Sequence, residues 1–205
     1  MRVLLSYSNI YDDMSKLTTP FLPSDLVIRH YPHQDSAFNF VSEEFNNVSK
    51  QQTQFVLDEL NKMKDNECLL YLEQDVLLLE RPEWFANQIK DYDMICQQDQ
   101  SLPCMGFLVV RNSPQARQSL ENTIKATNKV TNNQMAFHTK HNLKVGFFDT
   151  KDVWCYGALG MGEWRGEMFE FPETRPRAFH ANWTRGKDNK IKLLEMAIKK
   201  YNLNP

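Results

Sequence analysis

Two carboxylates interrupt the most apolar stretch of the sequence. Residues 68–82 read CLLYLEQDVLLLERP, with Glu73 and Asp75 between two hydrophobic runs. Residues two apart on an extended chain point to the same side, so both carboxylates can reach one divalent ion that carries a phosphate-bearing ligand. The alternative interpretation is two acids turned to water where a strand ends, because carboxylates are rarely buried without a partner.

The composition argues against a polyanionic partner. Lys and Arg number 24, Asp and Glu number 26, and the formal net charge is −2. Because basic residues are not in excess, we expect no nucleic-acid partner and no anionic membrane surface. The opening MRVLLSYSNI has too short an apolar run for a signal peptide or a membrane span. We therefore expect a soluble, cytoplasmic protein without membrane insertion.

The chain alternates between predicted strands and helices, which indicates an α/β fold with a central, mostly parallel sheet flanked by helices. The expected strands are 2–7, 25–30, 68–72, 92–96, 104–111, 145–148 and 177–182. The expected helices are 82–91, 113–127, 132–141, 187–201 and one that begins at Asn47 or Ser49 and ends near 64. Residues 149–176 hold four of the seven glycines and two tryptophans, so we expect an irregular, lid-like region there. The length of 205 residues fits a single domain, 1–205.

Glycine is absent from the first 105 residues, and all seven glycines lie at or after Gly106. A Rossmann G-x-G-x-x-G loop or a P-loop needs glycine because its backbone must approach phosphate closely. A nucleotide held by the N-terminal half must therefore be bound by strand ends, side chains and a metal.

Four segments carry a family resemblance when they are taken together. They are YLEQDVLLLERPEWF at 71–85, CMGFLVVRNSP at 104–114, NNQMAFH at 132–138 and HANWTRGKDNK at 180–190. In this order and spacing they resemble the nucleotide-diphospho-sugar transferases, which are glycosyltransferases of the Rossmann-like GT-A fold. The small size resembles free-standing bacterial or large-virus members of that family.

The resemblance implies a divalent metal site. In this sequence the implied metal ligands are Asp75, His180 and Glu73, with binding of the ribose hydroxyls as the other role for Glu73. Mixed carboxylate and imidazole ligands favour Mn²⁺, with Mg²⁺ as the second choice. Taken alone, a histidine such as His180 is more often an ordinary hydrogen-bonded residue, and the context HANW…GK favours a ligand instead. Glu73 stands where the family's D-x-D motif has its first aspartate, which leaves room for a changed sugar preference or reduced activity.

The remaining candidate donor contacts come from strand ends and from the resemblance. Ser6, Tyr7 and Ser8 end the first strand, where ligands of open α/β sheets collect, and Lys50 begins the first long helix. A core-edge tyrosine and a surface lysine are the structural alternatives. The resemblance implies that Gly186 and Lys187 bind the diphosphate, with a solvated lysine as the alternative. It also implies contacts with the nucleotide sugar by Gln74, Gly106, Asn133, Gln134 and Asn182. For Gly106 the alternative is a strand glycine that packing requires.

The catalytic carboxylate is the least determined part of the site. The candidates in the lid-like region are Asp149, Asp152, Glu163 and Glu167, of which Asp152 is preferred because Val153 and Trp154 follow it. Trp154 could stack on a sugar or simply pack in the core. The resemblance places Gln134 near the reaction centre, with Asn133 where the family has aspartate.

We therefore expect a metal-dependent glycosyltransferase that moves a hexose or pentose from a UDP-sugar, such as UDP-glucose, to a glycan, glycoprotein or other hydroxyl acceptor. Residues 1–100 form the predicted nucleotide-binding half. Residues 101–205 form the predicted sugar and acceptor half, with the diphosphate-binding segment at its C-terminal end. A catalytically weakened sugar-nucleotide or carbohydrate-binding module is the alternative. A sugar-nucleotide pyrophosphorylase is disfavoured because it needs an N-terminal glycine-rich loop.

Overall fold

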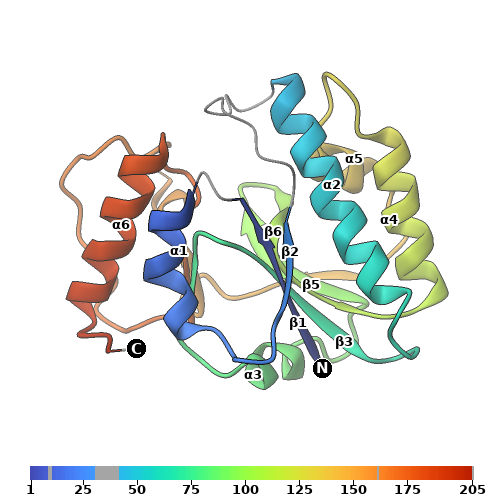
Figure 1. The fold of residues 1–205 in the computed structure, drawn as a ribbon, viewed down its shortest axis with the longest axis horizontal. Coiled ribbons are helices and arrows are strands. Elements are labelled where there is room, and N and C mark those ends of the chain that lie inside the picture. The colour runs from blue at the N-terminus through green and yellow to red at the C-terminus, as the bar shows by residue number, and fades with distance from the viewer. Residues whose placement is uncertain (9–10, 31–41, 161, 205) are drawn as a thin grey trace.

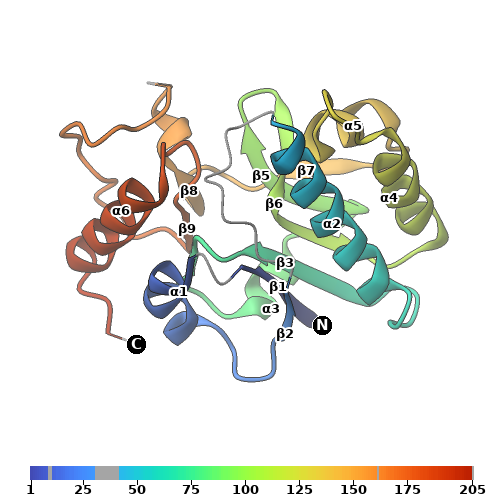
Figure 2. The ribbon, with the colours of Figure 1, turned by 45° about the horizontal axis from the view of Figure 1, so that its top comes forward.

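The computed structural model describes residues 1–8, 11–30, 42–160 and 162–204. Its central sheet has six strands in the order β2-β1-β3-β6-β5-β7 (Figures 1 and 2). β6 runs antiparallel to both of its neighbours and the other paired strands are parallel, so the mostly parallel sheet is confirmed. The strands are β1 (Arg2–Tyr7), β2 (Val27–His30), β3 (Cys68–Glu73), β5 (Met94–Asp99), β6 (Leu102–Arg111) and β7 (Val145–Phe147).

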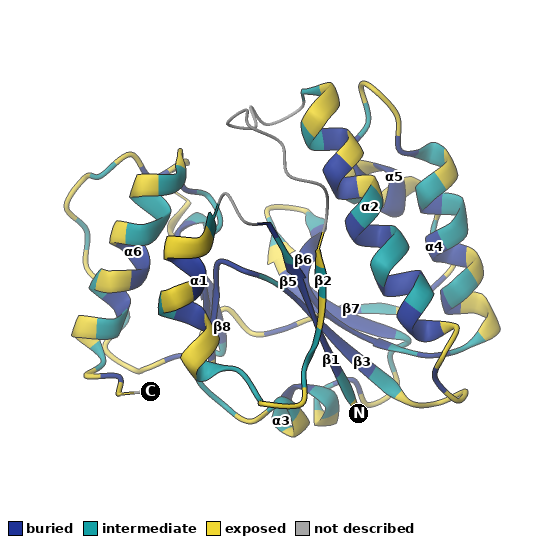
Figure 3. Ribbon diagram, viewed as in Figure 1, coloured by how far each residue is buried: buried dark blue, intermediate teal, exposed yellow. Residues whose placement is uncertain are grey.

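Both faces of this sheet are covered, which explains the continuous apolar run of β3. Leu69 and Tyr71 lie in the core beneath α2 (Glu43–Leu60), α4 (Pro114–Ala126) and α5 (Asn133–Lys140). Leu70 and Leu72 lie in the opposite core, which includes the α3 (Pro82–Asn87) side chain Phe85. Successive strand side chains alternate between the two faces of a sheet, so a strand that is buried on both faces has apolar residues on both. Figure 3 shows buried residues along the sheet and on the helices that cover it.

A second sheet of three strands, in the order β4-β9-β8, lies beside the first. It consists of β4 (Val76–Leu78), β8 (Val153–Cys155) and β9 (Ala178–His180), with α1 (Asp12–Thr18) and α6 (Lys187–Lys200) packed around Leu77, Trp154 and Phe179. The two helices lie next to each other in Figure 1. The chain passes from the first sheet to the second within two residues, Gln74 and Asp75. The acidic motif therefore sits at the junction of the two sheets.

The structure corrects several predicted boundaries. The helix expected to begin at Asn47 or Ser49 begins at Glu43, and the Ser42 hydroxyl caps it by accepting from the Phe45 amide at 3.1 Å. The prediction was wrong because the apolar periodicity starts only at Val48, after a polar first turn. The helix α1 and the strands β4 and β8 were not predicted, and β5 extends to Asp99. The lid-like region holds β8 and a 3₁₀ helix at Tyr156–Leu159. None of the helices in the described part of the chain has the length and hydrophobicity needed to cross a membrane.

A buried carboxylate ties α2 to the edge of the sheet. The side chain of Glu59 is 2% exposed and accepts from Arg2 at 2.9 Å, Lys62 at 2.7 Å and Arg29 Nε at 2.9 Å. Burial alone would raise the pKa of the Glu59 carboxyl. The hydrogen bonds and charges of Lys62 and Arg29 outweigh burial and lower that pKa below its ordinary value. Glu59 therefore stabilises the fold as the ionised form.

We expect Glu59→Gln to lower the free energy of unfolding by about 2 kcal/mol at pH 7, because three cations lose a buried ionic partner. A group with a lowered folded-state pKa stabilises above its ordinary pKa of 4.5 and loses that contribution as the pH falls through the folded-state value. The difference between variant and wild type should therefore shrink below about pH 4.5. Urea unfolding at several pH values measures it, with the exposed Glu195→Gln as control. A difference independent of pH would contradict this account.

Candidate metal centre

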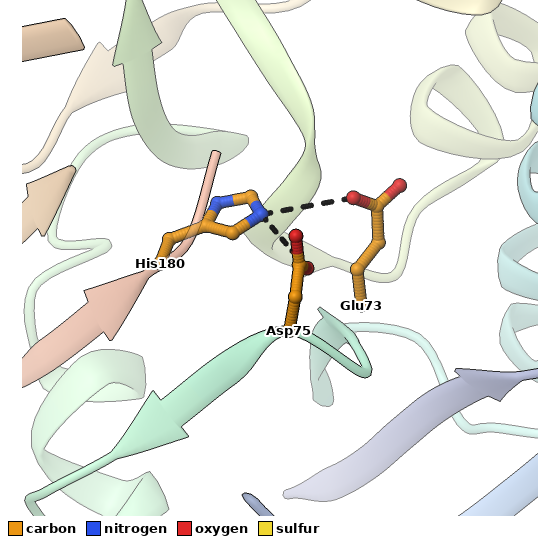
Figure 4. Close-up of side chains that lie close together, drawn as sticks. All are labelled: Glu73, Asp75 and His180. Atoms are coloured by element: carbon orange, nitrogen blue, oxygen red, sulfur yellow. Dashed lines mark ion pairs between the residues drawn. The ribbon is translucent and has the colours of Figure 1, made fainter. Parts of the chain in front are cut away.

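Three side chains that could bind an ion meet at the junction of the two sheets (Figure 4). Glu73 ends β3, Asp75 follows two residues later, and His180 ends β9 in register with Val76. His180 Nε2 lies 3.2 Å from Asp75 Oδ1 and 3.7 Å from Glu73 Oε2. One ligand atom from each residue lies within 4.8 Å of the other two, an arrangement found nowhere else among the described His, Cys, Asp and Glu side chains. The acid pair and the distant histidine predicted from the sequence are thus brought together.

The Asp75 carboxylate offers one oxygen to a ligand. Its side chain is 3% exposed, and its Oδ2 atom forms an ion pair with the Lys190 ammonium from α6. Its Oδ1 atom is buried and lies 3.2 Å from His180 Nε2, without a well-aligned hydrogen bond to any described residue. Buried charges are paired or coordinate metals, so a buried carboxylate oxygen that faces an imidazole and a second carboxylate marks a place for a cation. The donor set of two carboxylates and one imidazole fits a divalent metal.

Two glutamines hold the other ligands in place. Gln52 on α2 donates from Nε2 to Glu73 Oε1 at 3.0 Å, which leaves Oε2 toward His180. Gln97 Oε1 lies 2.8 Å from His180 Nδ1. In the neutral imidazole, an Nδ1–H donated to Gln97 would leave Nε2 free of a proton and facing both carboxylates, as a metal-ligating histidine requires. Gln97 Nε2 is buried and has no hydrogen-bond partner among the described residues.

The charges around Asp75 are strongly coupled. Burial alone would raise the pKa of the Asp75 carboxyl, but Lys190 and His180 outweigh burial and hold that pKa well below its usual range. Burial would lower the pKa of His180, but Asp75 outweighs burial and raises it well above its ordinary value. Without an ion, the site is therefore an anion balanced by an imidazolium and an ammonium. A bound divalent ion would supply that balance with His180 in its neutral form.

Two lysines of the C-terminal segment have different surroundings. Lys187 follows Gly186, which caps α6 with a φ of 83°, and its ammonium lies 3.3 Å from Asp13 on the surface. Lys190, one turn further along α6, reaches Asp75. Diphosphate binding by Gly186 and Lys187 stays a prediction, and Lys190 is a lysine beside Asp75 that the sequence did not indicate.

Gly106 makes room for a ligand of the site. It lies in a stretch of β6 where the pairing with β5 shifts register between Cys96 and Gln98. A Cβ atom at Gly106 would lie 2.4 Å from Glu73 Oε2, far inside contact distance. The absent side chain therefore leaves space for the Glu73 carboxylate, a packing reason for this glycine.

Hydrogen bonds connect the end of β1 to the acidic motif. The Ser6 hydroxyl accepts from Tyr71 at 2.8 Å, and the Tyr7 hydroxyl donates to Asp12. The Ser8 amide donates to Gln74 Oε1 at 2.7 Å, while the Ser8 hydroxyl is buried and has no hydrogen-bond partner among the described residues. In the described part of the chain, Ser8 is thus the member of this group with an unsatisfied polar atom.

A second group of side chains lies beyond Gln97 on the same strand. Asp99 accepts from Gln134 Nε2 at 2.9 Å and from the Trp183 indole at 2.6 Å. Asn182 donates to Cys104 Sγ at 3.9 Å and accepts from the Trp183 amide. Asn133 points elsewhere, because its amide group donates to Thr53 at 3.2 Å and ties α5 to α2. The structure thus separates the neighbours Asn133 and Gln134.

Three further candidates have contacts outside the metal centre. Lys50 lines a cavity of about 330 Å³ between α2 and Ile124 of α4. Asp152 precedes β8 at the end away from Cys155, the residue in register with His180, and its carboxylate lies 3.9 Å from Arg177. Trp154 is 4% exposed and stacks on Phe179 with ring centroids 5.0 Å apart, which supports the packing alternative.

Sequence reasoning missed five residues of this region: Gln52, Gln97, Asp99, Trp183 and Lys190. Lys190 and Trp183 lie within the segment HANWTRGKDNK, which the sequence analysis singled out. The directions in which these two side chains point could not be predicted from the sequence. Gln97 and Asp99 belong to the polar run QQDQ, which looks like a loop although its first part continues β5. Gln52 has no signal in the sequence, because its role depends on the rotation of α2.

Comparison with known proteins agrees with the geometry. The family model of nucleotide-diphospho-sugar transferases matches residues 14–194. No curated protein matches the sequence. Among solved structures, a glycosyltransferase involved in glycosylation of the major capsid of PBCV-1 matches with a TM-score of 0.60 at 11% identity, covering 96% of this chain and 100% of its own. The galactosyltransferase LgtC, in complex with donor and acceptor sugar analogues, matches with a TM-score of 0.55 at 11% identity over 100% and 98% of the two chains. The glycosyltransferase GlyE of Streptococcus pneumoniae TIGR4 matches with a TM-score of 0.58 at 13% identity over 99% and 61%. The fold is that of GT-A glycosyltransferases.

We expect Gly106→Ala to weaken Mn²⁺ binding about tenfold, because the new methyl group must displace the Glu73 carboxylate. Isothermal titration of the folded variant with Mn²⁺ measures the loss. Glu73→Ala serves as the matched background: once the carboxylate is gone, adding Gly106→Ala should cost little more. Equal effects of Gly106→Ala in both backgrounds would show that the glycine acts on something other than Glu73.

Proposed function

The chain belongs to the nucleotide-diphospho-sugar transferase family, and on that premise we propose that it is a metal-dependent glycosyltransferase that uses a UDP-sugar, such as UDP-glucose, as donor. The glycosyltransferase class follows from the family, whereas donor, metal and acceptor are our proposals. The proposed acceptor is a hydroxyl group of a glycan or glycoprotein. The proposed ion is Mn²⁺, because two carboxylates and an imidazole suit it better than Mg²⁺.

The convergence of Glu73, Asp75 and His180 on one buried place is the observation that carries this proposal. Asp75 Oδ1 faces His180 Nε2 at 3.2 Å, and the other oxygen of the same carboxylate pairs with Lys190, so a lysine ammonium lies directly beside the three candidate ligands. A divalent ion bound there would act as a Lewis acid on the leaving diphosphate. The Lys190 ammonium is placed to share its charge between Asp75 and a phosphate oxygen.

The protein's own residues would act on charge and orientation. Negative charge accumulates on phosphate oxygen as the nucleoside diphosphate departs, and fixed cations beside that oxygen stabilise the transition state. Glu73, Asp75 and His180 would hold the ion. The α6 N-terminus with Gly186 and Lys187 adds positive potential at the same end of the helix as Lys190.

The group around Asp99 is our proposed sugar-facing side of the site. Gln97 contacts His180, and Asp99, two residues further along β5, contacts Trp183, so both β5 side chains face the same C-terminal segment. Its bond to Nε2 of Gln134 fixes the orientation of that amide, which leaves the Gln134 carbonyl oxygen for a donor-sugar hydroxyl. The division into a nucleotide-binding half at 1–100 and a sugar and acceptor half at 101–205 remains part of the proposal, as does Asp152 as the catalytic carboxylate.

The proposed function is tested by incubating the protein with a panel of nucleotide sugars, with and without Mn²⁺, and scoring both binding and UDP release. We expect UDP release from a UDP-sugar that depends on Mn²⁺. Metal-dependent binding without turnover, across a range of acceptors, would favour the weakened binding module instead.

Asp75→Asn should reduce the transfer rate about a hundredfold, or roughly 3 kcal/mol, because it removes an anionic ligand while keeping the shape of the side chain. UDP release at saturating donor measures the loss, and circular dichroism checks the fold. Asp91→Asn, which alters an exposed aspartate just after α3, is the matched control and should keep its rate. Wild-type activity in a folded Asp75→Asn variant would show that the acidic motif is not catalytic.

Substitution of the two lysines separates their roles. Lys190→Ala should weaken UDP binding in the presence of Mn²⁺ about tenfold or more, because it removes the ammonium that is proposed to contact a phosphate oxygen beside Asp75. Lys187→Ala should have a much smaller effect, since its ammonium pairs with Asp13 on the surface. Calorimetric titration with UDP gives both values. The reverse order would return the diphosphate site to Lys187.

A further inference from the structure

The residue between the two acids has an environment of its own. Glu73 and Asp75 extend toward His180, whereas the side chain of Gln74 extends toward α1 and is 4% exposed as a whole residue. Neighbouring residues of an extended chain point to opposite sides. Because Glu73 and Asp75 point toward His180, the side chain of Gln74 must point away from it, toward α1. A buried amide must find hydrogen-bond partners there.

Gln74 finds partners on two separate segments. Its Oε1 atom accepts from the Ser8 amide at 2.7 Å, just after β1. Its Nε2 atom lies within hydrogen-bond distance of Ser8 O at 3.3 Å, Tyr11 O at 3.2 Å and Ser15 Oγ at 2.9 Å. An amide nitrogen carries two hydrogens, so these three acceptors share two donors. The side chain thereby fastens both the end of β1 and the start of α1.

The backbone of Gln74 is fastened to α1 as well. Thr18, in the last turn of α1, donates from its hydroxyl to the Gln74 carbonyl oxygen at 2.9 Å. The residue is therefore held on its side chain and on its main chain by one short helix. Rotation of the peptide units on either side of Gln74 would break these bonds and would also turn Glu73 and Asp75 away from His180.

From this geometry we propose that Gln74 is a positioning residue of the metal centre: it clamps α1 to the turn between β3 and β4 and so holds Glu73 and Asp75 at the spacing that an ion requires. The proposal rests on the proposed function in one respect, that Glu73 and Asp75 bind a divalent ion. Gln74 itself touches no ion. Groups that orient metal ligands change metal affinity about 10- to 100-fold when they are replaced.

The test is a titration of the full chain with Mn²⁺ in the absence of nucleotide. Binding is monitored by the loss of the free-ion signal in electron paramagnetic resonance. Gln74→Met keeps the length of the side chain and removes its hydrogen bonds, while Gln74→Glu sets a carboxylate against the carbonyl oxygens of Ser8 and Tyr11. We expect both variants to bind Mn²⁺ about tenfold more weakly than wild type. Gln88→Met is the matched control, because the side-chain amide of Gln88, at the end of α3, donates to Trp84 O away from the metal centre. The Mn²⁺ affinity of this variant should equal that of the wild type.

A second variant keeps the test informative if Gln74 variants do not fold. Thr18→Val removes the bond to the Gln74 carbonyl and leaves the Gln74 side chain intact, and we expect it to weaken Mn²⁺ binding severalfold. A purely structural role would lower the melting temperature while the folded protein kept its wild-type Mn²⁺ affinity, and that result would overturn the proposal. Absence of Mn²⁺ binding by the wild-type protein would instead overturn the metal site of the proposed function, and this inference with it.

Discussion

A buried carboxylate that must be neutralised governs the arrangement of this protein. Asp75 is 2% exposed, and an ionised acid so far from water is stable only beside positive charge. The cations come from the far end of the sequence: His180 from β9 and Lys190 from α6. Their pairing with Asp75 joins the second sheet and the last helix to the strand turn after β3. Neutralising the Asp75 carboxylate therefore also requires β9 and α6 to pack beside the turn that follows β3.

The same constraint explains how the chain could bind a diphosphate without a glycine-rich loop. In P-loop and Rossmann proteins backbone amides approach phosphate, which requires glycine. The first glycine here is Gly106, and it makes room for Glu73. In the proposed function, side-chain ligands oriented by Gln52 and Gln97 would take the place of such a loop. The positive charge would then come from an ion and from Lys190, both held at the junction of the two sheets.

The sequence predicted the parts of the fold that are governed by local patterns. The apolar run of β3, the helix caps at Ser113 and the spacing of Glu73 and Asp75 all follow from short-range rules, and Ser113 accepts from the Ala116 amide as a cap should. The helix α1 was missed because DDMSKLT is short and polar, and its packing on α6 is a long-range contact. Lys190 was missed because its contact with Asp75 depends on how α6 is rotated against a strand that is distant in the sequence. Tertiary packing decides such details, and local propensity does not contain them.

The central claim is that Glu73, Asp75 and His180 together hold a divalent ion that carries the donor diphosphate. A crystal structure of the protein with UDP and Mn²⁺, with anomalous diffraction data collected at the manganese edge, tests it most directly. We expect one anomalous peak within ligand distance of Asp75 Oδ1 and His180 Nε2, with the diphosphate next to Lys190. A bound UDP with no anomalous peak at these residues, and Asp75 still paired only with Lys190 and His180, would contradict it.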